Sequence, residues 1–284
     1  MPEIQLTQGT VTYRDEGTGP TVVLIHGLLV DGHVWDPVVS ALSGRARCIV
    51  PELPLGSHRI PMRADADLTP PGIAALIAEL MARLELHDVT LVGNDTGGAL
   101  SQLVVANHPD RLGRLVLTNC DAFENFPPSS FKPLVWALAR VPGALAGLGF
   151  GGRFKAVRGA SMKAMPLTVE PVPDELLKSW VEPLRDRRIR RDLLRVLRAV
   201  SSKHTLAAAE KLPAFDRPAL IVWGMRDPFF PISDGKRLAN LLPYSSLERI
   251  QNARAFVQLD APDRLAELIA EMLPAVAQAP PAAA

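Results

Sequence analysis

Apolar positions along the chain fall into short continuous runs and longer helically spaced stretches, and the two kinds alternate. Residues 3–27 predict a strand, a turn and a second strand ending in TVVLIHG, an uninterrupted apolar run typical of strands buried on both faces of a sheet. In LTPPGIAALIAELMARLEL, Ile73, Ile77, Leu80 and Leu84 recur every three or four positions, which predicts an amphipathic helix entered through prolines. Alternating strands and helices with short connections indicate a parallel sheet covered by helices on both faces.

This alternation is interrupted once. Strands are predicted at ARCIVPELP, VTLVGND and RLVLTNC, but the segment from Asp121 to Pro218 has helical spacing and proline breaks without a run of the strand type. PALIVWG and SSLERI then predict strands again, each followed by a predicted helix. We therefore expect a helical insertion in an α/β domain. The expected boundaries are 1–121 with 218–275 for the α/β core, 122–217 for the helical cap, and 276–284 for a flexible tail rich in Ala and Pro.

Composition narrows the class of protein. Hydrophobic residues make up 48% of the 284 residues, which is enough for a substantial core. Basic and acidic residues number 31 and 30, so we expect neither nucleic acid nor a membrane as partner. Two cysteines do not make a disulfide framework, and we expect a cytoplasmic protein. Only the Gly-interrupted region 141–152 approaches about 18 uncharged apolar residues, the length of a membrane span.

The sequence LVGNDTGG, between a predicted strand and a predicted helix, holds an aspartate in a tight turn. Gly93 and Gly97 permit close backbone packing, and the turn forces Asp95 into a strained position aimed into a cleft. The backbone N–H groups of Thr96 and Leu28 are expected to hold a negative oxygen near the helix N-terminus. Alternatively, Asp95 is only the N-cap of the helix, a position that favours aspartate.

Three motifs together resemble the α/β-hydrolase fold: the pair His26-Gly27 after a strand, the elbow Gly93-Asn94-Asp95-Thr96-Gly97, and the stretch WGMRD ending at Asp227. Their order and spacing cover nearly the whole chain. Within this fold, an aspartate at the elbow resembles the haloalkane dehalogenases and epoxide hydrolases. The resemblance implies that Asp95 attacks an sp3 carbon and forms an alkyl ester, which water hydrolyses with the help of a base.

In these enzymes the base is a histidine after the eighth strand, oriented by an acid after the sixth or seventh strand. The acid corresponds here to Asp227, with Asp121 as the alternative; each also has a plain structural interpretation, as a turn residue before Pro228 and as a cap of the insertion. The place of the histidine, before Phe256, is occupied by Ala255. An ester formed on this chain would therefore lack its usual base.

No histidine follows His204, so three explanations stay open. Ala255 is either an engineered replacement or a natural departure, and the equally off-pattern Arg254 favours the second. Another histidine could substitute, namely His33, His58 or His204, each of which otherwise has a surface or structural role. Finally, the elbow aspartate could have a raised pKa in an apolar cleft and move protons, or bind a polar ligand.

The groups that recognise a halide or an epoxide in the resembling enzymes are replaced. Dehalogenases hold the halide with a tryptophan beside the nucleophile and a second donor after HG, where this chain has Thr96 and Leu28. Epoxide hydrolases use tyrosines from the cap, whereas Tyr13 and Tyr244 both lie outside the insertion. Neither kind of group therefore occupies its usual position.

Apolar residues of the insertion predict a lid over a hydrophobic ligand, although most of them would pack the lid itself. These residues are Trp136, Trp180, Phe131, Phe150, Phe154, Met162 and Met165. Ligands of such sheets bind at the carboxyl ends of the strands. Further pocket candidates there and nearby are His26, Gly27, His33, His58, Asn94, Asn119, Cys120, Ala255 and Phe256. The arginine-rich run 185–198 is interpreted as a solvated helix face with buried stems.

The chain has no P-loop, no GxGxxG after a strand and no Cys/His metal spacing, so we expect no cofactor and no metal. The predicted function is that of an α/β-hydrolase-fold enzyme with Asp95 as nucleophile, hydrolysing a small hydrophobic substrate. The alternatives are a lyase, isomerase or cyclase that uses Asp95 as general acid or base, and a binding protein that has lost catalysis. Oligomeric state is not predicted.

Overall fold

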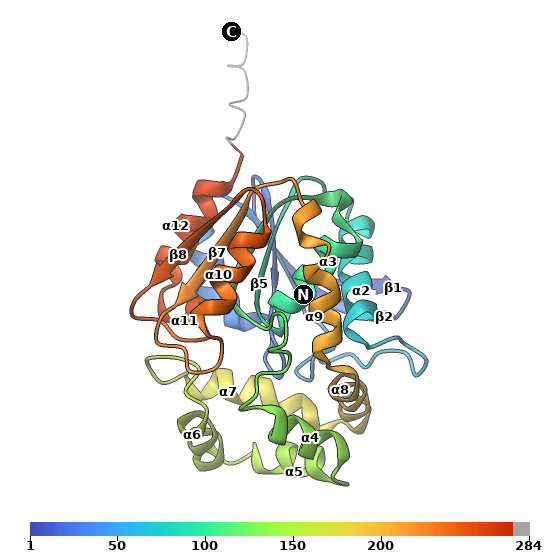
Figure 1. Cartoon of the computed structure of the whole chain (residues 1–284). Coiled ribbons are helices and arrows are strands. Elements are labelled where there is room, and N and C mark those ends of the chain that lie inside the picture. The colour runs from blue at the N-terminus through green and yellow to red at the C-terminus, as the bar shows by residue number, and fades with distance from the viewer. Residues whose placement is uncertain (275–284) are drawn as a thin grey trace.

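The computed structural model describes residues 1–274 and is built on one eight-stranded sheet (Figure 1). The strand order is β1-β2-β4-β3-β5-β6-β7-β8. β1, β2 and β4 pair antiparallel, and all the other neighbours pair parallel. The strands are β1 (Glu3–Leu6), β2 (Gly9–Gly17), β3 (Thr21–Ile25), β4 (Arg47–Pro51), β5 (Val89–Asp95), β6 (Leu112–Cys120), β7 (Ala219–Gly224) and β8 (Ser245–Ile250). The predicted mostly parallel α/β sheet is thereby confirmed.

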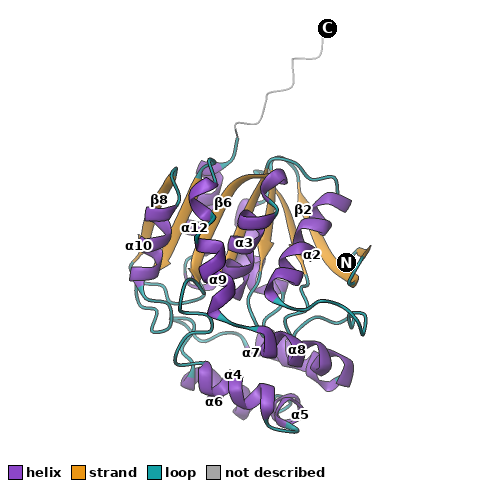
Figure 2. Cartoon of the chain, turned by 45° about the vertical axis from the view of Figure 1, so that its right-hand side comes forward, coloured by secondary structure: helices purple, strands orange, loops and turns teal. Residues whose placement is uncertain are grey.

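Helices cover both faces of this sheet. α2, α3, α9 and α10 lie in front of it in Figure 2, whereas α12 lies behind it and packs against α1. The helices of the α/β part are α1 (Asp36–Leu42), α2 (Pro70–Arg83), α3 (Thr96–Asn107), α10 (Ile232–Leu241), α11 (Val257–Asp260) and α12 (Pro262–Met272). Two short 3₁₀ helices, η1 (Gly32–Trp35) and η2 (Pro109–Arg111), complete the part before β6.

The central strands are buried because their sequences are uninterrupted apolar runs. Every residue of β7 is buried, as are six of the seven residues of β5. The edge strand β8 instead mixes exposed and half-buried positions, in keeping with its more polar sequence SSLERI. The hydrophobic core therefore lies around β3, β5, β6 and β7, the strands whose carboxyl ends carry the site.

The segment between β6 and β7 is helical. It contains α4 (Lys132–Arg140), α5 (Ala144–Gly151), α6 (Lys155–Ala164), α7 (Asp174–Val181), η3 (Glu182–Arg185), α8 (Arg187–Ala199), α9 (Ser202–Ala209) and η4 (Leu212–Ala214). α9 packs against α3, so the last part of the range expected for the cap lies on the sheet side of the molecule. The tail expected over 276–284 lies outside the described residues.

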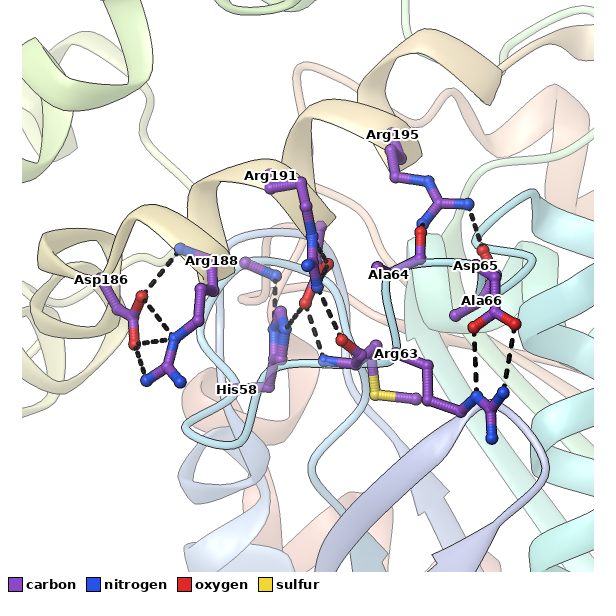
Figure 3. Close-up of polar contacts among 12 residues, drawn as sticks. His58, Arg63, Ala64, Asp65, Ala66, Asp186, Arg188, Arg191 and Arg195 are labelled. Carbon is purple, nitrogen blue, oxygen red and sulfur yellow. Dashed lines mark hydrogen bonds and ion pairs between the residues drawn. The ribbon is translucent and has the colours of Figure 1, made fainter.

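Helix α8 is tied to the loop after β4 (Figure 3). The buried Asp192 carboxylate accepts a hydrogen bond from Met62 N–H at 2.8 Å and lies 3.4 Å from His58 Nε2. Arg191 donates to the Met62 carbonyl, and Arg195 donates to backbone carbonyls of the same loop. The run expected to be a solvated face therefore also joins the cap to the core.

Candidate functional site

Asp95 lies at the sharp turn between β5 and α3, with φ +54° and ψ −131°. This region is rare for a residue other than glycine and is typical of functional sites. Two glycines make the turn possible. A Cβ atom on Gly97 would lie 2.4 Å from the Ile25 carbonyl oxygen, and one on Gly27 would lie 2.5 Å from Asp95 Oδ2. The HG pair and the elbow are therefore in direct contact.

The Asp95 carboxylate is held by the first backbone group of α3. Its Oδ1 atom accepts a hydrogen bond from Thr96 N–H at 2.6 Å. Burial raises the pKa of Asp95 to about 7, the Thr96 hydrogen bonds oppose this rise, and the negative charge of Asp227 adds to it. Asp95 is thus both the cap of α3 and a carboxylate that titrates near neutrality. Leu28, the second expected backbone donor, lines the same cavity.

A second carboxyl group reaches the same point from the end of β6. Thr96 Oγ1 donates to Asp121 Oδ2 at 3.0 Å and lies 3.4 Å from Asp95 Oδ1. Burial, followed by the charge of Asp95, raises the pKa of Asp121 well above its ordinary value. Burial and the neighbouring carboxylate therefore both favour the protonated form of Asp121, and Thr96 bridges the two carboxyl groups.

Asp227 is held behind this pair. Its Oδ2 atom accepts a hydrogen bond from Asn119 Nδ2 at 2.7 Å, and its Oδ1 atom accepts from the N–H groups of Phe229 and Phe230. Burial raises the pKa of Asp227 to about 6. Asp227 is outside the cavity lining and affects Asp95 through its charge. The two acids expected as alternatives therefore both lie near the elbow: Asp121 contacts Thr96, and Asp227 affects the pKa of Asp95 through its charge.

Ala255, in the position of the missing histidine, is completely buried and lies outside the cavity lining. Its carbonyl oxygen accepts a hydrogen bond from Asn94 Nδ2 at 2.8 Å, and Gln258 Nε2 donates to Asn94 Oδ1 at 2.8 Å. Asn94 therefore fixes the segment after β8 to the elbow. The next residue, Phe256, does line the cavity and packs edge-to-face on Trp180, with ring centroids 6.0 Å apart.

None of the candidate histidines lines the cavity. His26 Nε2 accepts a hydrogen bond from Leu53 N–H at 2.9 Å, and burial lowers the pKa of His26 to about 4, so His26 is a neutral structural residue. His33 is paired with Asp36 on the surface, and His58 lies beside Asp192 in the contact between cap and core. His204 belongs to α9. The site therefore has no imidazole base in place.

Asn119 and Cys120 also lie outside the lining. Asn119 holds Asp227 and accepts a hydrogen bond from Gly224 N–H at 2.6 Å. Cys120 is completely buried beside Gly98, where a Cβ atom would lie 2.3 Å from the Cys120 Cβ, and burial raises the pKa of the thiol. Both residues support the elbow from behind instead of facing a ligand.

The cavity next to Asp95 has a volume of about 290 Å³ and is mostly apolar. Asp95, Thr96 and Asp121 form a polar cluster in its wall. The cap contributes most of the rest, including Phe131, Leu134, Val135, Leu138, Val157, Met162, Met165, Leu177 and Trp180. Such a cavity fits a hydrophobic molecule with one small polar group.

Three aromatic residues of the lid do not face the cavity. Trp136 is 55% exposed, Phe150 and Phe154 are also exposed, and none of the three lines the cavity. Phe230 and Phe126 do line it, although the sequence did not single them out. Phe230 follows the WGMRD motif by only three residues, and that proximity was the available signal.

Comparisons with known proteins agree with this geometry. The alpha/beta hydrolase fold family model matches residues 20–262. The cis-3-alkyl-4-alkyloxetan-2-one decarboxylase of Xanthomonas campestris is 30% identical over 93% of this chain and 92% of its own length. Haloalkane dehalogenase 2 of Mycobacterium tuberculosis is 28% identical over the same shares. An alpha/beta hydrolase fold protein from Burkholderia ambifaria superimposes with a TM-score of 0.79 at 23% identity, covering 94% of this chain and 96% of its own. The chain belongs to the alpha/beta hydrolase fold family and is related to haloalkane dehalogenases and to an oxetanone decarboxylase.

Proposed function

We propose that the protein is a non-hydrolytic enzyme in which Asp95 opens the ring of a hydrophobic 3,4-dialkyloxetan-2-one and releases an alkene and carbon dioxide. The observation that carries this proposal is the polar cluster of Asp95, Thr96 and Asp121 in an apolar cavity that no histidine lines. The relationship to the oxetan-2-one decarboxylase supports this substrate class.

The proposed reaction balances without a base. The Asp95 carboxylate attacks ring carbon 4, the bond from that carbon to the ring oxygen breaks, and the electron pair leaves on the oxygen, which becomes part of a carboxylate. The bond between ring carbons 2 and 3 then breaks as carbon dioxide departs. Its electrons form the double bond between carbons 3 and 4, and the ester bond to Asp95 breaks to restore the carboxylate. No proton moves and no water is consumed, so the base that ester hydrolysis needs is not required.

The surroundings of Asp95 suit both steps. Its raised pKa reflects a carboxylate that is poorly solvated, and poor solvation makes an ionised oxygen more reactive toward carbon. The second step moves the negative charge from the substrate carboxylate back to Asp95, whose Oδ1 atom Thr96 N–H holds. Thr96 N–H holds the reacting carboxylate in place, and Asp121 accepts a hydrogen bond from the Thr96 hydroxyl.

The second candidate function is hydrolysis of a haloalkane or epoxide through an alkyl ester formed on Asp95. Two observations favour it. Asn119 holds Asp227, the expected acid of such hydrolases, where its charge raises the pKa of Asp95. The chain is also related to haloalkane dehalogenase 2. With Ala255 in the position of the base, we expect an ester from a haloalkane to persist on the protein. This candidate therefore differs from the first in its product.

The decisive experiment is incubation of a cis-3,4-dialkyloxetan-2-one with the protein in oxygen-18 water. We expect the alkene and no labelled 3-hydroxy acid, and a loss of at least about 10³-fold in rate for Asp95→Asn, because the reacting carboxylate is removed. Asp186→Asn, at a half-buried carboxylate that caps α8 outside the cavity lining, is the matched control and should keep the rate.

Other products would contradict the proposal. A labelled 3-hydroxy acid would indicate hydrolysis. Halide release from haloalkanes, or a stable alkyl adduct on Asp95 in intact-protein mass spectrometry with no alkene formed, would favour the second candidate. No turnover and no adduct with either substrate class would leave neither standing.

A further inference from the structure

The outermost helices of the cap carry an exposed apolar surface. α4, α5 and α6 lie farther from the sheet than α7 and α8 (Figures 1 and 2). Of the eight large apolar side chains that are exposed in residues 1–274, six lie on or next to these helices. We call these six the cap patch: Leu134, Trp136, Val141, Phe150, Phe154 and Val157. Apolar patches of this kind mark interaction sites.

The same segment is positively charged. No acidic residue occurs between Glu124 and Glu170, whereas six basic residues do: Lys132, Arg140, Arg153, Lys155, Arg158 and Lys163. Arg158 is buried and paired with Asp174 at 2.6 Å, but the other five are exposed and have no ion pair among the described residues. The near-zero net charge of the whole chain hides this local excess.

We propose that the cap patch docks on the surface of an anionic lipid bilayer. Exposed Trp and Phe side chains partition into the lipid headgroup region, and neighbouring Lys and Arg side chains attract anionic lipids. A second copy of the chain is a poorer partner, because a symmetric contact would bring the five cations of one patch against those of the other. A bilayer supplies both the apolar layer and the negative charge.

The length and bend of α4 and α5 fit binding at a membrane surface better than crossing the membrane. Within residues 1–274, no single helix is long and apolar enough to span a membrane. α4 and α5 reach that length and composition only together, and they are bent by 108° at the break between them. A bent apolar pair with basic side chains fits a position in the plane of the interface.

The cap patch is continuous with the cavity. Leu134 and Val157 are exposed residues of the patch and also line the cavity beside Asp95. Docking through the patch would bring the cavity opening against lipid, where a hydrophobic molecule is most concentrated. The docking surface itself does not depend on which reaction Asp95 performs.

Vesicle flotation tests the proposal with the whole protein. We expect binding to phosphatidylcholine vesicles that contain phosphatidylglycerol, weaker binding to pure phosphatidylcholine, and release at about 1 M sodium chloride, where the Debye length is only about 3 Å. Arg153→Glu with Lys155→Glu should weaken binding at least about 25-fold, since each cation near an anionic surface contributes about fivefold. The matched control is Lys236→Glu with Arg249→Glu, a pair of exposed cations on the α/β part.

Trp136 provides a direct readout, because the other tryptophans, Trp35, Trp180 and Trp223, are buried. Vesicles should shift its fluorescence to the blue, and brominated lipids should quench it. Trp136→Phe should lose the shift and keep most of the binding. Phe150→Ser with Phe154→Ser should abolish binding, whereas Tyr244→Ser, at an exposed aromatic elsewhere, should not.

Three results would overturn the proposal. The first is no binding to anionic vesicles, and the second is binding that the patch variants leave unchanged. The third is self-association in sedimentation velocity that depends on the patch while vesicle binding is absent, which would identify a second copy as the occupant. Alkene formation or hydrolysis in detergent-free solution would be unaffected by any of these results, so this test and that of the reaction fail independently.

Discussion

Asp95 combines a backbone conformation of positive φ, rare outside glycine, with a buried carboxylate whose pKa is raised by burial to about 7. The first feature costs about 1–3 kcal/mol in a folded protein. The second means that ionised Asp95 destabilises the folded state relative to an aspartate in water. The surrounding structure tolerates both, because Thr96 N–H holds one oxygen and Gly27 leaves room for the other. Strain and charge are concentrated on one residue, the one that faces the cavity.

The pKa of Asp95 predicts how the rate depends on pH. The proposed reaction needs the ionised form, so we expect kcat/KM to be half-maximal near pH 7 and to fall as pH decreases through that value. Asp227→Asn removes a negative charge that raises this pKa, and the midpoint should therefore move to lower pH. The pH–rate profile measures this shift, with Asp263→Asn on the surface as control. A midpoint that stays or rises would contradict the assignment.

Gly27→Ala tests the contact between the HG pair and the elbow. The new Cβ would lie 2.5 Å from Asp95 Oδ2, so the carboxylate must move. We expect a loss of about 10²-fold in kcat/KM, the cost of displacing a reacting group by about 1 Å, with an unchanged near-ultraviolet circular dichroism spectrum. Gly159→Ala, with open space around its Cβ position, should keep full activity. Equal activity in both variants would show that Asp95 does not react.

The sequence predicted the elbow better than the lid. Asp95, Thr96 and Asp121 were singled out because a turn and two strand ends fix their places through local sequence. Trp136 and Trp180 are indistinguishable by local pattern, yet one is 55% exposed and the other is buried in the cavity wall. Which face of a cap helix is covered depends on helices far away in the sequence, and helical spacing does not record that.

Among the elements, α8 is the cap helix that is hydrogen-bonded to the loop after β4 of the α/β core. Its arginines suggested a solvated face, because a run of like charges is usually solvated. The buried Asp192 changes this, since its carboxylate binds Met62 N–H and Arg191 and lies 3.4 Å from His58 Nε2. Figure 3 shows Arg191 of α8 beside His58. A single acid within a basic run was the available signal, but its partners lie far away in the sequence.

Asp192→Ala should destabilise the protein strongly. The change leaves the buried Met62 N–H without its acceptor, which typically costs about 1–3 kcal/mol, and it also removes the ion pair of Arg191, whose side chain is 37% exposed. Urea unfolding measures the free energy, and proteolysis should become faster in the loop 58–66. Asp186→Asn, at the half-buried N-cap of the same helix, should change stability by less than about 1 kcal/mol, because asparagine is also a good N-cap. Similar stability of the two variants would show that the contact is dispensable.

At the scale of the molecule, the core and the cap differ in how far local sequence determines them. Each central strand is recognisable alone, because it is buried on both faces by its own apolar run. The cavity is different: it exists only where the carboxyl ends of β5 and β6 meet the undersides of the cap helices. The shape of the cavity and the exposure of the cap patch therefore depend on how the cap packs on the sheet, and no single stretch of sequence determines them.

Leu134 and Val157 line the cavity and are also exposed, so we infer that the cavity reaches the surface beside them, and this bears on the choice of substrate. A closed cavity would limit the length of the substrate's alkyl chains. A cavity that is closed beside Asp95 but reaches the surface at its other end would set no such limit. We therefore expect kcat/KM to rise with alkyl length until the cavity is filled and then to level off. Leu134→Trp should convert that plateau into a decline by narrowing the opening. A homologous series of oxetanones measures both dependences of kcat/KM on alkyl length. A sharp optimum for the unaltered protein would mean that long alkyl chains cannot extend beyond the cavity.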